Sequence, residues 1–135
     1  MKFNKLIPEL SVSNFEKSLD YYTKILGFKI EYTRRNFAFL SLNGSQIMIE
    51  EVNNTWKTGE LNYPFGRGIN FQIDVKDITP LLQSLKNNKI VLFRNPKDNW
   101  YRKAKKLLGC REFLIQDPDG YLLRFSQDIG SKNIK

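Results

Sequence analysis

The sequence has 135 residues, with 22 Lys and Arg against 14 Asp and Glu, for a formal net charge of +8. This length suits one domain with its own core, and the aromatic content of 13% argues against a disordered chain. We find no apolar run near the roughly 20 residues that span a bilayer, and no signal-peptide core, and so expect a soluble cytoplasmic protein. The chain has no His and a single Cys, which excludes His-based catalysis and an internal disulfide.

The first half of the chain is predicted to contain one helix and four strands. Ser13 and Glu16 match a capping box, apolar residues then recur at helical spacing, and Gly27 ends the helix. Alternation and turn signals predict strands over residues 6–12, 28–34, 37–42 and 46–52. A polar, aromatic connection is expected over 53–68.

The second half repeats this order. Asp77 is expected to cap a helix, between strands over 70–75 and 89–94. Residues 95–109 are interpreted as a basic, aromatic loop. The strongest hairpin signal follows, since Asp117–Gly120 suits a tight turn between two apolar strands.

Two copies of a strand-helix-three-strand module therefore make up the predicted fold. We expect a single α+β domain over 1–135, with tandem βαβββ modules at 5–53 and 68–128. An open, curved sheet with one helix cannot bury both of its faces. The modules are therefore expected to form a curved mixed sheet that bears a ligand cleft.

Two segments of the sequence resemble a known superfamily. SVSNFEKSLDYYTKILGFKI and the ending DPDGYLLRF resemble the vicinal oxygen chelate superfamily, which includes glyoxalases, extradiol dioxygenases and bleomycin resistance proteins. GRGINFQIDV and REFLIQDPDGYLLRFSQ look most like the bleomycin resistance branch. The resemblance covers nearly the whole chain and implies the glyoxalase-like fold.

The resemblance also implies where a metal would be held. The metal ligands of the superfamily's enzymes correspond here to Ile7, Glu50, Asn70 and Arg124. Only Glu50 could ligate a divalent ion well, because Ile7 has no donor, Asn70 is a weak one and Arg124 carries a positive charge. We therefore expect no metal and no cofactor, with Glu50 as the only plausible remnant of a metal site.

Without a metal, the resemblance implies binding in place of chemistry. The expected function is sequestration of a bleomycin-class glycopeptide, or another planar aromatic ligand, without chemical change, as in antibiotic resistance. The basic composition departs from this pattern, because an acidic cleft would better attract a cationic glycopeptide. The alternative is a glyoxalase-like metal-dependent lyase or isomerase, or a dioxygenase, that recruits Glu9 or Glu112 as a further ligand.

A homodimer is expected, with a cleft built from both subunits. We expect this because the concave sheet faces are too apolar to remain exposed to solvent in a monomer. The apolar residues on these faces include Ile47, Ile49, Phe71 and Phe125. The sequence does not decide whether the two modules pair within one chain or between two chains.

The candidate ligand-binding residues combine loop aromatics with polar strand positions. They are Trp56, Tyr63, Phe65, Asn70, Trp100, Tyr101 and Arg124. The aromatics could instead cover the sheet ends or a dimer interface. Arg124, between large apolar residues, is a ligand anchor, half of a buried ion pair, or an edge residue that reaches water.

Basic residues surround Trp100 and Tyr101. They could bind a nucleic acid, but RKAKK at 102–106 is also typical of one solvated helical turn, which we favour. Nucleic acid is accordingly not an expected partner. Asp117 and Asp119 are explained by the turn, and we assign them no acid-base role.

Overall fold

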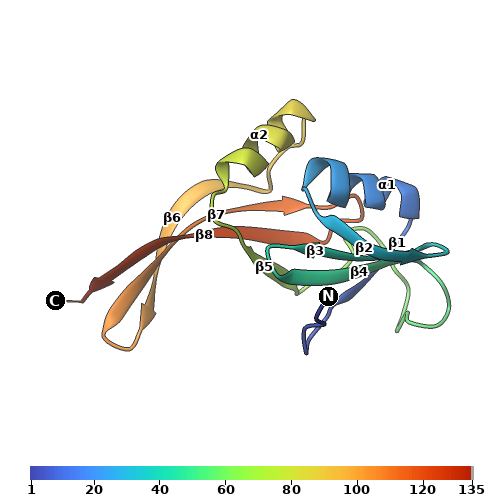
Figure 1. The fold of residues 1–135 in the computed structure, drawn as a ribbon, viewed down its shortest axis with the longest axis horizontal. Helices are drawn as coiled ribbons and strands as arrows, with labels where there is room; N and C mark the ends of the chain where they lie inside the picture. Colours follow the sequence, from blue (N-terminus) through green and yellow to red (C-terminus); the bar gives the residue numbers. More distant parts are fainter. Residues whose placement is uncertain (135) are drawn as a thin grey trace. The chain divides into compact units, whose positions relative to one another are not determined.

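A computed structural model describes residues 1–134 of the chain, and it contains the two predicted βαβββ modules. The first has β1 (Glu9–Val12), α1 (Phe15–Asp20), the π-helical turn η1 (Tyr21–Ile25), β2 (Lys29–Arg34), β3 (Phe37–Leu42) and β4 (Ser45–Glu51). The second has β5 (Asn70–Asp74), α2 (Thr79–Asn87), β6 (Arg94–Lys103), β7 (Lys106–Gln116) and β8 (Leu122–Asn133) (Figure 1).

Each module forms its own four-stranded mixed sheet, and the two sheets have the same topology. The strand orders are β1-β4-β3-β2 and β5-β8-β7-β6. In each sheet the first strand of the module runs parallel to the last, and the other neighbours are antiparallel. The α+β fold with tandem modules is thus as predicted.

The chain divides into two compact units. The first unit contains Met1–Arg67 and also Asp117–Tyr121, the turn between β7 and β8. The second unit contains Gly68–Gln116 and the residues from Leu122 onward. No helix among residues 1–134 is both long and apolar enough to cross a membrane.

In the first unit, one face of the sheet packs against the helix, and Phe37 and Phe39 are buried on the other face. Strand alternation and register bring Leu10, Ala38 and Ile49 together across β1, β4 and β3, and all three are buried. α1 and η1 add Phe15 and Tyr22 to this layer. The register therefore fixes which side of the sheet faces the helix.

The second unit has a corresponding core. Ile73, Phe125 and Phe113 are register neighbours across β5, β8 and β7, and Leu81 and Leu85 of α2 are buried with them. The Phe113 and Phe125 rings stack with centroids 5.5 Å apart. Full burial of side chains of this size contributes about 2 kcal/mol each.

The first helix starts one residue later than predicted. Asn14 is the N-cap and its side chain accepts a 3.1 Å hydrogen bond from the Lys17 amide. Ser13 instead donates its backbone N–H to Asp119 Oδ2 at 3.0 Å, so the predicted capping box does not form. Gly27 ends the helix with φ of +86°, as expected.

The largest correction concerns residues 95–109, which form no loop. β6 and β7 pair from Arg94 to the tight turn at Ala104–Lys105 as one long hairpin, and the predicted strand at 89–94 is mostly irregular. Ten-residue β6 is exposed at nearly every position. A strand that is wet on both faces has no apolar alternation, so its sequence looks like a loop.

The apolar residues from which a dimer was predicted do not lie on an exposed sheet face. Ile47, Ile49 and Phe125 are at most 5% exposed, because the register places them on the core side of their own sheets. Phe71 is half-buried. The prediction that these residues form an exposed apolar sheet face is therefore wrong, and it gives no reason for dimerisation.

Candidate functional site

One face of the second sheet carries polar side chains on all four strands, together with Leu108, Leu114 and Leu122. Its side chains alternate with the core residues and point away from α2. We call it the polar sheet face, made by Asn70, Gln72 and Asp74 of β5, Arg124, Ser126 and Asp128 of β8, Cys110 and Glu112 of β7, and Asn99 and Tyr101 of β6. A polar face opposite a packed core is ordinary for a sheet that faces solvent on one side, so the contacts within it decide whether it can be a site.

Glu112 is the centre of this face. Its side chain is buried, and its Oε1 accepts hydrogen bonds from Asn99 Nδ2 at 2.9 Å and from the Tyr101 hydroxyl. Its Oε2 lies 3.9 Å from Arg124 Nη1. The hydrogen bond to Glu112 raises the pKa of Tyr101, with smaller contributions from burial and from the Glu112 charge. These contacts hold a carboxylate and a guanidinium in place at the middle of the sheet.

Arg124 is incompletely satisfied in this arrangement. Its side chain is 29% exposed, and its buried Nε has no hydrogen-bond partner among the described residues. A guanidinium has five N–H donors, and only Nη1 approaches an acidic partner, at a distance that is long for a hydrogen bond. Because the side chain is partly exposed, its outer N–H groups can donate to an acceptor on a bound molecule, although the buried Nε cannot.

A hollow of about 260 Å³ lies next to this pair on the same face. Gln72, Asp74, Cys110, Ser126 and Asp128 line it, together with Leu108 and the neighbouring backbone. Two carboxylates and an Arg–Glu pair on one face can bind cationic and neutral polar groups of a small molecule. Cys110 is half-buried here.

Comparison with known proteins places this site in a family context. The model of the Glyoxalase/Bleomycin resistance protein/Dioxygenase superfamily matches residues 5–125. The chain belongs to this superfamily. The expected resemblance is thus confirmed over nearly the whole sequence.

Curated relatives of this superfamily member are bleomycin resistance proteins. Those of Geobacillus stearothermophilus and Staphylococcus aureus are each 29% identical to it over 135 residues, covering 93% of this chain and 97% of the relative. Among solved structures, TioX from Micromonospora sp. ML1 has a TM-score of 0.72 at 15% identity, covering 94% of this chain and all of TioX. An integron cassette protein from V. cholerae has a TM-score of 0.67 at 19% identity, covering 94% and 97%. At such identities the two structures show the shared fold.

The four residues that the resemblance assigns to metal ligation do not fit a metal ion in their chemistry. Arg124 places a cation beside Glu112 where the last ligand would stand. Glu50, in the first unit, accepts a 2.7 Å hydrogen bond from Asn53, and Ile7 and Asn70 supply no anionic donor. Within residues 1–134, no three His, Cys, Asp or Glu side chains are grouped closely enough to hold one.

The structure separates the predicted ligand-binding residues of the second unit. Tyr101 and Arg124 meet through Glu112, and Asn70 is exposed on the same face. Trp100 lies on the opposite face, where it covers Gly109 and has Lys132 Nζ 3.9 Å from its ring centroid. Both Trp100 and Tyr101 were predicted as ligand contacts from a loop, but successive residues of a strand point to opposite faces.

The predicted aromatics of the first unit also differ from one another. Trp56 and Tyr63 are more than 60% exposed. Phe65 is buried against Tyr121, edge to face with centroids 5.9 Å apart, although it still borders a hollow of about 200 Å³. Phe65 is therefore mainly a core residue of its unit, with little ring surface left for a ligand.

Several residues of the polar sheet face were missed in the sequence. Glu112 was considered only as an alternative metal ligand, and Asn99, Asp74 and Asp128 were not considered. Recognition of 94–103 as a strand would have revealed Asn99 and Tyr101 as an alternating pair beside Glu112. The basic composition of that segment hid this signal.

Proposed function

We propose that this protein binds a small molecule and sequesters it without chemical change, as a metal-free member of the bleomycin resistance type. The observation that carries the proposal is the Arg124–Glu112 pair, because it puts a fixed cation at the position of a metal ligand. The 29% identity to bleomycin resistance proteins over 93% of the chain supports the same conclusion.

The polar sheet face suits a bleomycin-class glycopeptide better than the net charge of +8 suggests. Asp74 and Asp128 border the hollow and can attract cationic groups, while Arg124 can donate to amide or sugar oxygens. Tyr101 adds an aromatic edge next to Glu112. Local charge at the site, more than the total charge of the chain, governs this attraction.

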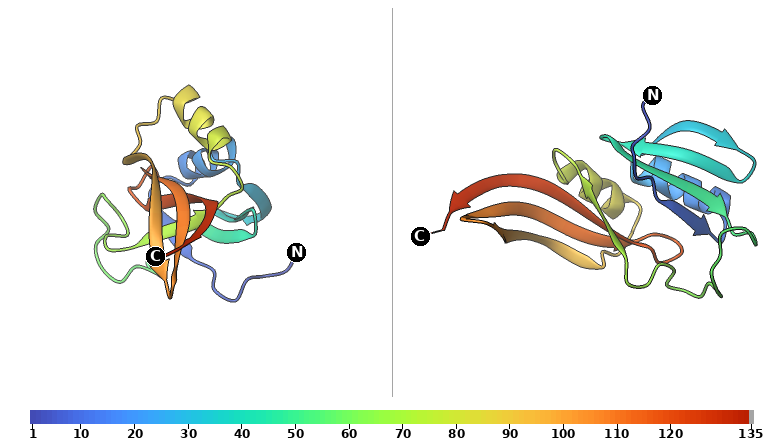
Figure 2. Two further views of the ribbon diagram at one scale, coloured as in Figure 1. Left: turned by 90° about the vertical axis from the view of Figure 1, so that its left-hand side faces the viewer. Right: turned by 90° about the horizontal axis from the view of Figure 1, so that it is seen from below.

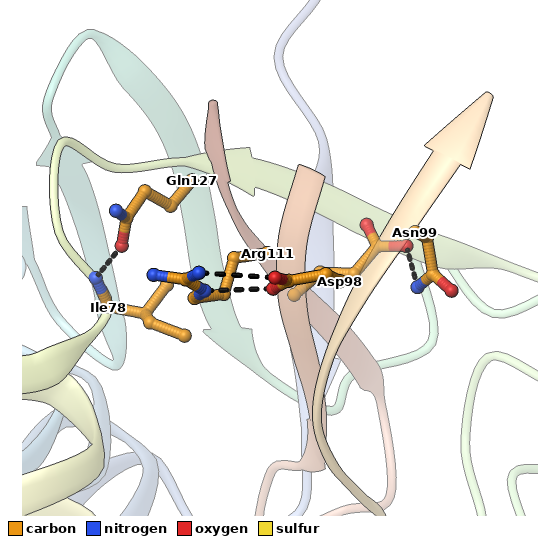
Figure 3. Close-up of polar contacts among 6 residues, drawn as sticks. Ile78, Asp98, Asn99, Arg111 and Gln127 are labelled. Carbon is orange, nitrogen blue, oxygen red and sulfur yellow. Dashed lines mark hydrogen bonds and ion pairs between the residues drawn. The ribbon is translucent and has the colours of Figure 1, made fainter. Parts of the chain in front are cut away.

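Calorimetric titration with bleomycin tests the proposal. We expect saturable binding that weakens about tenfold or more in Arg124→Met, since a charge-assisted hydrogen bond is worth about 1.5–3 kcal/mol. Arg111→Met is the matched control: Arg111 is also an arginine of the second sheet, but it lies on the opposite face and pairs with Asp98 at 2.8 Å (Figure 3).

Two results would contradict the proposal. Absence of binding heat in the titration would exclude bleomycin as the ligand. An equal loss of bleomycin affinity in both arginine variants would exclude the polar sheet face as the binding site. Stoichiometric zinc, nickel, iron or manganese that survives dialysis, with turnover of an α-ketoaldehyde adduct, would favour the metal-dependent alternative.

A homodimer that shares the ligand cleft is part of this proposal. Val91 and Phe93, which precede β6, are 89% and 48% exposed, and apolar side chains of this kind favour burial by a partner. Sedimentation at micromolar concentration should give a dimer. A monomer that binds ligand with full affinity would contradict the shared cleft.

A further inference from the structure

The second sheet continues well beyond its helix-covered part. β5 pairs with β8 only as far as Ser126, whereas β8 continues to Asn133 beside β7, and β7 pairs with β6 out to Lys103. Three strands therefore form a ribbon without β5, and they run side by side to its end (Figures 1 and 2).

Basic side chains collect at the end of this ribbon. We call this cluster the basic ribbon end, made by Arg102, Lys103, Lys105, Lys106 and Lys132. The segments 98–111 and 127–134 hold six basic and two acidic residues, so their net charge is 6 − 2 = +4, half of the +8 of the chain. Asp98 forms an ion pair with Arg111 (Figure 3). No member of the basic ribbon end has an ion-pair partner within residues 1–134.

The solvated helical turn predicted for residues 102–106 is not formed. The segment is a β-hairpin whose turn is Ala104–Lys105, and Lys103 and Lys106 are opposite each other across it. A hollow of about 580 Å³ lies at the turn and is lined by Lys103, Lys105, Lys106 and Ser131, with Ala104 and Leu108. The turn thus presents several ammonium groups and a hydroxyl around one concavity.

The neighbouring aromatics do not form one platform for base stacking. Trp100 and Tyr101 are 38% and 45% exposed, but they lie on opposite faces of β6, and Lys132 Nζ is 3.9 Å from the Trp100 ring centroid. Single-stranded binding generally uses free aromatic faces, whereas duplex binding can rest on phosphate contacts alone.

We propose that the basic ribbon end binds the phosphate backbone of double-stranded DNA without sequence preference. This activity is separate from the proposed ligand binding, because the lysines of the turn lie outside the Arg124–Glu112 pair. Each lysine that contacts a phosphate releases counterions, so the association weakens steeply with salt.

Fluorescence anisotropy with a labelled duplex of arbitrary sequence, at several salt concentrations, tests the proposal. We expect the triple variant Lys103→Gln, Lys105→Gln, Lys106→Gln to bind at least tenfold more weakly, with a salt slope shallower by roughly 2 to 3. The matched control is Lys17→Gln, Lys76→Gln, Lys86→Gln, which removes three exposed lysines elsewhere and has the same net charge. The control should bind the duplex nearly as well as the unmodified protein.

Urea unfolding shows whether both variants are folded, and bleomycin calorimetry shows whether the ligand site is unchanged. Equal weakening in the two triple variants would overturn the proposal, because total charge would then explain binding. Absence of binding near about 100 mM salt would also overturn it, as would equal affinity for a single strand or for polyglutamate.

Discussion

The Tyr22 hydroxyl donates a 2.6 Å hydrogen bond to Asp117 Oδ2, and both residues are buried in the first unit although 95 positions separate them in the sequence. Asp117 Oδ1 also accepts from the amides of Asp119 and Tyr121, each at 2.9 Å. The Tyr121 hydroxyl in turn donates to the Ser11 carbonyl at 2.8 Å. The carboxylate was predicted to serve only its own turn, but it also fixes that turn to η1.

Removal of the Tyr22 hydroxyl should therefore destabilise the protein. We expect Tyr22→Phe to lower the free energy of unfolding by about 1–3 kcal/mol, because a buried carboxylate loses a hydrogen bond. Urea unfolding measures this change. Tyr63→Phe, at an exposed position, should stay within about 0.5 kcal/mol of the unmodified protein, and similar losses in both variants would contradict the role of this bond.

The same carboxyl group should make stability depend on pH. Burial raises the pKa of Asp117 to about 6, despite the hydrogen bonds that lower it, whereas the unfolded value is about 3.9. Between these values the folded state binds more protons than the unfolded chain, so the contribution of Asp117 to stability falls as pH rises from about 4 to about 6. The total change is on the order of 3 kcal/mol.

Unfolding of the unmodified protein and of Asp117→Asn at pH 4 and pH 7 checks this sign. The stability of the unmodified protein relative to the variant should be greater at pH 4, because other groups titrate alike in both proteins. A relative stability that rises toward pH 7 would show that the hydrogen bonds outweigh burial.

Gly120 should tolerate no side chain. Its φ is +93°, and an added Cβ would lie 2.6 Å from the Pro64 Cα, which is backbone and cannot turn aside. Gly44 has a similar φ of +86° but nothing within 4 Å of the same position. Gly44→Ala should therefore cost about 1–2 kcal/mol from backbone strain alone, and Gly120→Ala about 1–3 kcal/mol more. Equal losses by urea unfolding would mean that Pro64 moves freely.

Glu112→Gln should lower the pKa of Tyr101. The largest cause of its raised pKa is the hydrogen bond to Glu112, and the Glu112 charge adds to it. Replacement of the carboxylate by an amide removes the charge and weakens the bond, while Arg124 remains nearby and favours the phenolate. NMR titration of the Tyr101 ring measures the shift. An unchanged Tyr101 pKa would indicate that burial alone sets it.

Local sequence signals were sufficient for most of the fold. Residues 37–42 were predicted as a strand and form β3 with the same bounds, because apolar alternation and the Asn43–Gly44 turn are local features. Register then follows from these turns, and with it the two buried faces. The place of Arg124 between Leu123 and Phe125 left three alternatives open, and the structure shows its pairing with Glu112.

By itself, the sequence determined the two modules and their strand-helix order, since periodicity and turn residues are properties of short segments. Only the tertiary structure decided that 94–103 is a strand, that Trp100 and Tyr101 diverge, and that Glu112 receives Tyr101, Asn99 and Arg124. The physical reason is that a solvated strand is defined by its hydrogen bonds to neighbouring strands. A polar network is likewise defined by which strands lie side by side. Neither property is encoded by the spacing of residues along one segment.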